Sequence, residues 1–125
     1  MLQFPGSQTI EITSPPQNAV AVAGTSVQLT CGVSEPYEGY FQWRFYNFGQ
    51  DQGTQVYSTP PFSVTDPKYH KFEEFGLEIR PVGWRDAGKY DCNFLTGDVR
   101  DSAYIVILGQ LKIWFIYFRC FLFEL

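Results

Sequence analysis

The side chains that could carry chemistry in this sequence are one histidine, a few acidic pairs and three cysteines. No serine, cysteine or carboxylate is spaced to form a catalytic group with His70, so we interpret it as a surface residue and not as a general base. The acidic pairs would bind calcium only weakly, and solvated loop charge is the favoured interpretation of Glu73, Glu74, Asp98 and Asp101.

Other common functional motifs are missing from the sequence. No glycine-rich phosphate loop follows an expected strand and opens a helix. The formal net charge of −4 provides no basic field for a nucleic acid backbone. No asparagine lies in an Asn-x-Ser/Thr sequon, so no N-linked glycan is expected to shield a face. We therefore expect no enzyme activity, no catalytic residue, no cofactor, no bound metal and no nucleic acid partner.

The most informative segment is Asp86–Cys92, which places Tyr90 two residues before Cys92 and just after a turn of Asp and Gly. This is the spacing of a tyrosine corner, in which the Tyr hydroxyl caps the turn that begins a strand of an antiparallel sandwich. Because side chains two residues apart share one face of a strand, Tyr90 and Cys92 should point into the same core. A second cysteine is then expected upstream, on the opposite sheet.

Cys31 fits this expectation. It ends the alternating segment 26–31, in which Val27, Leu29 and Cys31 share one face of a strand. Twelve residues later, Trp43 lies in an aromatic segment over residues 40–46. The chain therefore places a Cys, a Trp, a Tyr and a second Cys in this order.

The order of these residues resembles that of the immunoglobulin superfamily over roughly residues 9–108. The resemblance implies an all-β fold, an immunoglobulin-like Greek-key β-sandwich with one inter-sheet disulfide between Cys31 and Cys92. Trp43, Tyr90 and Asp86 would form its core signature. The length between the two cysteines favours a variable-like or intermediate set with at least a C′ strand. Such a bond would stabilise the domain by about 4 kcal/mol.

Periodicity and turn formers divide the chain into short strands. The first strand is expected to switch sheets at Pro15-Pro16, because proline has no N–H to donate. Val82 is expected to cover the bottom of the core and Trp84 to be half exposed. We expect strands at residues 8–13, 18–22, 26–31, 40–46, 55–57, 76–80, 88–95 and 102–108, a short strand near 69–72, and turns at 34–39, 47–53, 81–86 and 96–101.

The two ends of the chain differ from the middle. We divide it into an immunoglobulin-like domain, residues 1–109, and a hydrophobic C-terminal tail, residues 110–125. The tail is short for a membrane span and carries Lys112, Arg119 and Glu124, so a truncated anchor or an extension is favoured over a transmembrane helix. An added strand or helix, or self-association, are the other interpretations. Cys120 is expected to be an incidental thiol, and a membrane is a partner only if the tail is part of an anchor.

The disulfide implied by the resemblance favours the extracellular space or the cell surface. Residues 1–7 have neither a basic nor an apolar region, so a signal peptide is not present in this chain. It was either removed, or the chain is a fragment of a longer protein. The alternative is a reduced intracellular structural repeat.

One expected sheet face has an unusual composition. Residues 40–46, 88–95 and 102–108 would be strands C, F and G, and their outward rows are rich in Tyr, with Arg among polar groups, as in protein interfaces. The alternatives are that loops cover the face or that the Tyr residues are only strand formers. The expected partner-binding residues are Tyr40, Gln42, Arg44, Tyr46, Asp91, Asn93, Leu95, Tyr104 and Val106.

A closer resemblance is carried by segments 16–24, 41–43, 77–79 and 86–92, which look like the membrane-distal domain of nephrin and Kirrel-type adhesion proteins. It implies a recognition or cell-adhesion module whose C, F and G face binds another immunoglobulin-like domain, as a homodimer or with a different partner. An immune-type receptor that binds ligand through loops 35–39 and 96–101 is the alternative.

Overall fold

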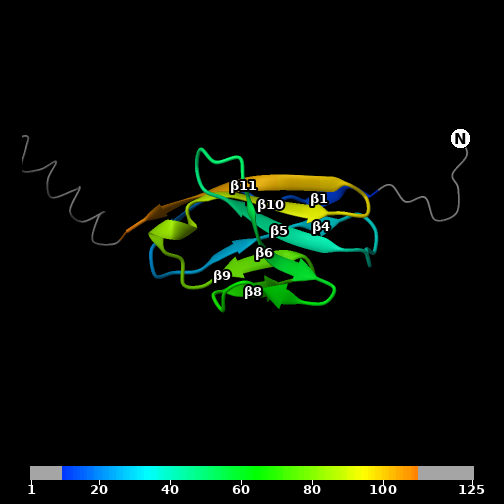
Figure 1. The fold of residues 1–125 in the computed structure, drawn as a ribbon, viewed down its shortest axis with the longest axis horizontal. Helices are drawn as coiled ribbons and strands as arrows, with labels where there is room; N and C mark the ends of the chain where they lie inside the picture. Colours follow the sequence, from blue (N-terminus) through cyan, green and yellow to red (C-terminus); the bar gives the residue numbers. More distant parts are fainter. Residues whose placement is uncertain (1–9, 110–125) are drawn as a thin grey trace, which may run out of the picture.

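A computed structural model describes residues 10–109 as a β-sandwich (Figure 1). Residues 1–9 and 110–125, and with them the expected tail, Cys120 and the start of the first strand, lie outside the described residues. The strands are β1 (Ile12–Ser14), β2 (Ala19–Val22), β3 (Val27–Leu29), β4 (Gly32–Val33), β5 (Phe41–Tyr46), β6 (Thr54–Thr59), β7 (Ser63–Val64), β8 (Tyr69–Phe72), β9 (Gly76–Ile79), β10 (Gly88–Phe94) and β11 (Val99–Leu108).

The larger sheet has six strands in the order β2-β11-β10-β5-β6-β7. Strand β10 lies at its centre and pairs antiparallel with β11 and β5, which are the strands G and C of the immunoglobulin fold. Strands β3, β9 and β8 form a second sheet, and β1 pairs with β4. The expected sheet switch is confirmed, because β1 pairs with β4 whereas β2, after Pro15-Pro16, pairs in parallel with β11.

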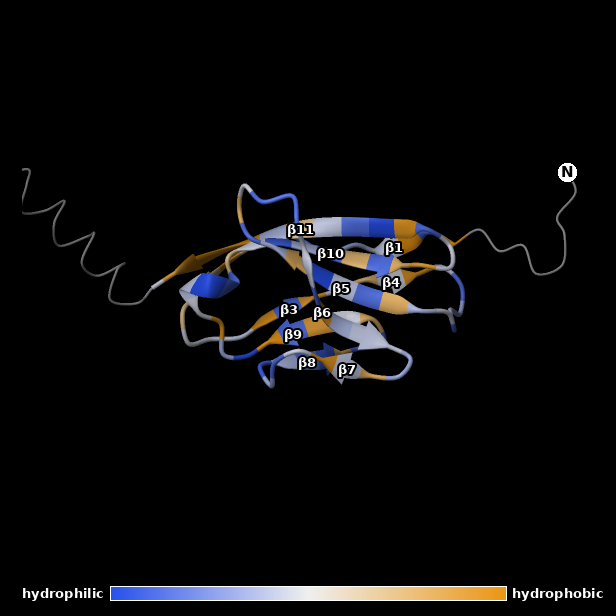
Figure 2. Ribbon diagram, viewed as in Figure 1, coloured by the Kyte–Doolittle hydropathy of each residue, from blue (hydrophilic) through white to orange (hydrophobic). Residues whose placement is uncertain are grey.

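The core forms from the inward residues of both sheets, as the period-2 pattern predicts. Hydrophobic and hydrophilic residues alternate along β5 and β10, whereas β11 ends in a continuous hydrophobic stretch (Figure 2). The disulfide between Cys31 and Cys92 joins the two sheets with a Cα–Cα distance of 6.5 Å, which confirms the expected pair. Fully buried side chains include Leu29, Phe41, Trp43, Leu77, Ile79, Tyr90, Phe94, Ala103 and Ile105.

The tyrosine corner is confirmed at the start of β10. The Tyr90 hydroxyl donates a hydrogen bond of 2.6 Å to the Asp86 carbonyl, at the end of the 3-10 helix η1 (Trp84–Asp86). The Asp86 carboxylate accepts a bond of 2.7 Å from the Gly83 N–H and forms an ion pair with Lys68. The sequence analysis did not identify Lys68, because it approaches this turn from the segment before β8.

We expect Tyr90→Phe to lower the free energy of unfolding by about 1–2 kcal/mol, since it leaves a buried carbonyl without its donor. Burial, with Tyr69 and Asp86 nearby, raises the pKa of Tyr90, so the hydroxyl keeps its proton and remains a donor. Urea denaturation measures the change. Tyr104→Phe is the matched control, because Tyr104 is 46% exposed. Equal stability of the two variants would mean that the corner contributes nothing.

The turn between β10 and β11 is shorter than the expected turn at residues 96–101. The Asp98 N–H donates to the Leu95 carbonyl at 3.3 Å, and Asp98 adopts a φ of 50°. An Asp tolerates this left-handed conformation, so the chain reverses early and β11 begins at Val99. Arg100 therefore lies opposite Asn93 in the sheet instead of in a loop.

Further details concern the outer strands and the segment around η1. The short strand expected near residues 69–72 is confirmed as β8, which pairs with β9. Strand β6 extends past the expected 55–57, and β7 pairs with it where no strand was expected. Trp84 is 69% exposed, more than the expected half, because it lies on the outer side of η1. Val82 is buried, as expected.

The buried core and the disulfide lie between Ile10 and Ile105. The domain boundary at residue 109 stays a prediction: we expect residues 1–109 to fold without the remaining residues, and such a truncated chain tests this. Over residues 10–109, no helix combines the length and the apolar character needed to cross a membrane.

Candidate protein-binding face

The outward side chains of β11, β10 and β5 form a regular array, which we call the β11–β10–β5 face. Cross-strand neighbours of this kind lie close enough to act as one surface. In this array, each outward residue of β10 lies between one from β11 and one from β5: Lys89 between Tyr104 and Tyr46, Asp91 between Ser102 and Arg44, and Asn93 between Arg100 and Gln42.

The structure brings the nine expected partner-binding residues onto or beside this face. Six of them belong to the array. Val106 continues the outward row of β11, next to Tyr104. Tyr40 and Leu95 lie at the opposite end, where the Leu95 N–H donates to the Tyr40 carbonyl at 3.0 Å.

The solvent exposure of these nine residues varies widely along the face. Tyr40, Leu95, Tyr104 and Val106 are 37–46% exposed, but Gln42 and Asp91 are only 7% and 9% exposed. Arg44, Tyr46 and Asn93 are intermediate. An outward direction therefore does not make Gln42 and Asp91 open to solvent. Both lie in the middle of the sheet, Gln42 between Asn93 and Ser58, and Asp91 between Ser102 and Arg44, where neighbours on both sides cover them.

Two cations of the face are held by contacts within the domain. Nη2 of Arg44 donates to the Gly53 carbonyl at 2.6 Å, which ties the turn between β5 and β6 to the sheet. Nζ of Lys89 lies 4.6 Å from the centroid of the Tyr46 ring, in cation–π range. These contacts order the side chains that a partner would meet.

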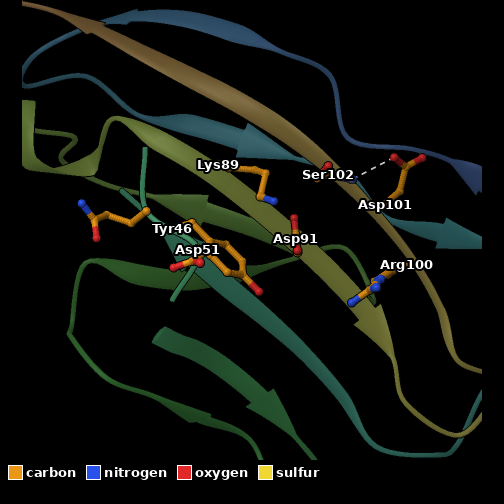
Figure 3. Close-up of a pocket in the computed structure, with 8 residues that line it drawn as sticks. Tyr46, Asp51, Lys89, Asp91, Arg100, Asp101 and Ser102 are labelled. Atoms are coloured by element: carbon orange, nitrogen blue, oxygen red, sulfur yellow. Dashed lines mark hydrogen bonds between the residues drawn. The ribbon is translucent and has the colours of Figure 1, made fainter. Parts of the chain in front are cut away.

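A polar hollow of about 510 Å³ opens on this face (Figure 3). Burial raises the pKa of Asp91, and the nearby Lys89, Arg100 and Arg44 lower it in part. Arg100 and Asp101 were not expected on the face, because the expected turn ended at residue 101. Ser102 was expected at the start of a strand but was not among the expected partner-binding residues. The hollow is lined by Tyr46, Gln50, Asp51, Lys89, Asp91, Arg100, Asp101 and Ser102.

An exposed apolar strip lies beside the hollow, and we define it as Val20, Phe48, Tyr104, Val106 and Leu108. Their exposed fractions are 41–68%. Val20 on β2 lies opposite Val106 on β11. The Phe48 ring stacks on the Tyr104 ring, with centroids 6.0 Å apart and an interplanar angle of 8°. Contiguous apolar surface of this kind is characteristic of binding sites.

Other parts of the described chain offer less to a ligand. Within residues 10–109, no group of three or more His, Cys, Asp or Glu side chains is placed to hold a metal ion. Trp84 and Phe62 are also exposed, but they lie on η1 and on the turn between β6 and β7. The β11–β10–β5 face therefore combines an apolar strip with a polar hollow.

The inter-sheet disulfide, the tyrosine corner and the parallel pairing of β2 with β11 define an immunoglobulin-like domain. A sequence model of the immunoglobulin domain matches residues 11–94, more than half of the chain. The chain therefore belongs to the immunoglobulin-domain family, as the sequence resemblance predicted.

Comparisons with individual proteins agree with this assignment. Protein sidekick-1 of Gallus gallus is 28% identical over 93 residues, which are 74% of this chain and 4% of the length of that protein. The Duf (Kirre) D1 structure is 26% identical, with a TM-score of 0.60, over 80% of this chain and 97% of that one. The RIG-5 IG1 homodimer structure is 19% identical, with a TM-score of 0.65, over 80% and 98% of the two chains.

Proposed function

We propose that this chain is an extracellular recognition or cell-adhesion module that binds another immunoglobulin-like domain through its β11–β10–β5 face. The observation that carries the proposal is the exposed apolar strip beside a polar, partly buried centre. An apolar patch with aromatic anchors and a polar rim is the usual composition of a protein interface. Binding of this kind involves no chemical turnover.

The similar proteins support the choice of partner. The RIG-5 domain, which has the same fold, forms a homodimer, and the similarity to Duf (Kirre) D1 agrees with the Kirrel-type resemblance of the sequence. That resemblance implies pairing through the face of strands C, F and G. The disulfide supports an extracellular location, because such bonds persist outside the reducing cytosol.

The charge distribution favours a second copy of the chain as the first partner to test. The face carries the cations Arg44, Lys89 and Arg100 and the anion Asp91, and Asp101 also lines its hollow. Since both signs are interspersed, two identical faces can approach without a single-sign field between them. An isologous dimer would then bury the apolar strip of each copy.

We expect Tyr104→Lys to weaken self-association of oxidised residues 1–109 by about 30-fold or more, as removal of an aromatic anchor does at interfaces. The new ammonium would replace a ring that stacks on Phe48 in the apolar strip. Sedimentation equilibrium over a concentration series measures the dimer constant. Trp84→Lys is the matched control, because it changes an exposed aromatic residue on η1, off the sheet. Arg44→Glu is less suitable, since it also breaks the bond to Gly53.

A monomer at every concentration would contradict the homophilic form and favour a different protein as the partner. A dimer that Tyr104→Lys leaves intact would contradict the assignment of the face. Exchange of loops 35–39 and 96–101 then separates face binding from the alternative of a receptor that uses its loops.

A further inference from the structure

Two oxygen atoms at the centre of the β11–β10–β5 face are buried without a hydrogen-bond donor: Oδ1 of Asp91 and Oδ1 of Asn93. The two residues lie two positions apart on β10, so both side chains are on the same side of the sheet. Asp91 is only 9% exposed and lines the polar hollow (Figure 3). Buried acceptors in folded proteins almost always have a donor, so these atoms mark a place where a bound group would supply one.

The hollow's own side chains leave this carboxylate without a partner. Within residues 10–109, the ion pairs are Lys68–Asp86 and Arg80–Glu78, and neither lies in the hollow. Nζ of Lys89 lies over the Tyr46 ring instead.

Charges of both signs line the hollow, and the cation Arg44 lies beside Asp91 on β5. The lining holds three carboxylates, Asp51, Asp91 and Asp101, and two cations, Lys89 and Arg100. One of the three is already used within its own strand, because Oδ1 of Asp101 accepts a bond of 2.8 Å from the Ser102 N–H. Because Arg44 donates to the Gly53 carbonyl and Lys89 lies over the Tyr46 ring, a bound group must supply the N–H donors that the Asp91 carboxylate lacks.

We propose that the hollow receives the guanidinium group of an arginine from the partner immunoglobulin-like domain. This inference rests on the proposed function, because a second domain must bring the side chain to the face. A guanidinium carries five N–H donors in a planar fork, so it can donate to the Asp91 carboxylate and to the neighbouring Asn93 amide oxygen together. A lysine ammonium is a compact point charge that lacks this geometry, and a neutral donor would form a weaker hydrogen bond with the carboxylate than a charged donor does.

The test uses a small probe because the partner protein is not identified. Oxidised, isotope-labelled residues 1–109 are titrated with ethylguanidinium chloride and, separately, with ethylammonium chloride at equal ionic strength. NMR follows the Asp91 carboxyl carbon and the Asn93 side-chain amide. We expect saturable shifts at these groups with ethylguanidinium, at about tenfold lower concentration than with ethylammonium.

Two variants check the assignment. Asp91→Asn keeps the shape of the side chain and should weaken ethylguanidinium binding at least about tenfold. Asp98→Asn, in the exposed turn after β10, is the matched control and should leave it unchanged. Equal shifts with the two cations would overturn the proposal even if Asp91→Asn failed to fold, and so would binding that survives in a folded Asp91→Asn variant.

This titration is independent of self-association. If the domain dimerises through the face but does not prefer ethylguanidinium, the proposed arginine in the hollow is overturned and the proposed pairing face is not. If the domain is a monomer but prefers ethylguanidinium, homophilic pairing is contradicted and the proposed arginine in the hollow is not.

Discussion

Replacing Cys31 and Cys92 together by alanine is expected to lower the free energy of unfolding of residues 1–109 by about 4 kcal/mol. The bond closes a long loop, with a sequence separation of 61. In the chain-entropy model, its removal raises the conformational entropy of the unfolded chain and so favours unfolding. Domains of this size are stable by only about 5–15 kcal/mol, so the loss is a large share of the total. Urea denaturation of the oxidised chain and of the double variant measures it.

The reduced, unmodified chain is the matched control, because it lacks the bond but keeps both sulfur atoms in the core. We expect its unfolding midpoint to fall close to that of the double variant. A thiol reagent in the absence and presence of reductant reports whether the pair is oxidised, since the bond hides two thiols. A chain that is equally stable when reduced would indicate that the pair only packs, and would favour the intracellular structural repeat.

The features of the fold that the sequence predicts are those encoded by local period and spacing. The tyrosine corner depends on Asp86, Tyr90 and Cys92, which lie within one turn and one strand, so a single segment specifies it. The resemblance implies that Trp43 faces the core, and alternation then places Phe41 on the same inward side. These features share a cause: neighbouring residues decide them.

The features that the sequence did not predict depend on partners distant in the chain. Strand β7 consists of Ser63–Val64 and exists because it pairs with β6, so no period of its own marks it. Lys68 reaches Asp86 across the turn, a contact that no spacing rule suggests. The early start of β11 depends on the left-handed backbone of Asp98, which an Asp permits but does not require.

The candidate site also combines features that the sequence predicts with features that depend on residues distant in the chain. Alternation predicts that Gln42 and Asp91 point outward, but their exposure depends on the side chains of the adjacent strands. Val20 was within reach of the sequence, because Ala19 and Ala21 face inward on either side of it and its strand was expected to join this sheet. Phe48 lies in a turn without periodicity, so its stacking on Tyr104 required the structure.

Replacing Trp43 by alanine is the second large effect that we expect, a loss of about 3–5 kcal/mol in the free energy of unfolding. Trp43 is 0% exposed, and its ring meets the Phe41 ring edge-on at a centroid distance of 6.2 Å. Truncation removes this burial and leaves a cavity between two sheets that the disulfide holds together, so the neighbours can fill it only in part. Urea denaturation of residues 1–109 measures the loss.

Two further variants separate the contributions to this loss. Trp43→Phe keeps an aromatic ring but removes the indole N–H, which donates at 2.9 Å to the carbonyl of Phe75. An unpartnered buried carbonyl costs about 1–3 kcal/mol, so this variant should lie between the unmodified chain and Trp43→Ala. Trp84→Ala removes an indole that is 69% exposed and should change the stability by less than about 0.5 kcal/mol. If Trp43→Ala cost no more than Trp84→Ala, the residue would not be the centre of the core, and the position of the whole outward row of β5 would have to be assigned again.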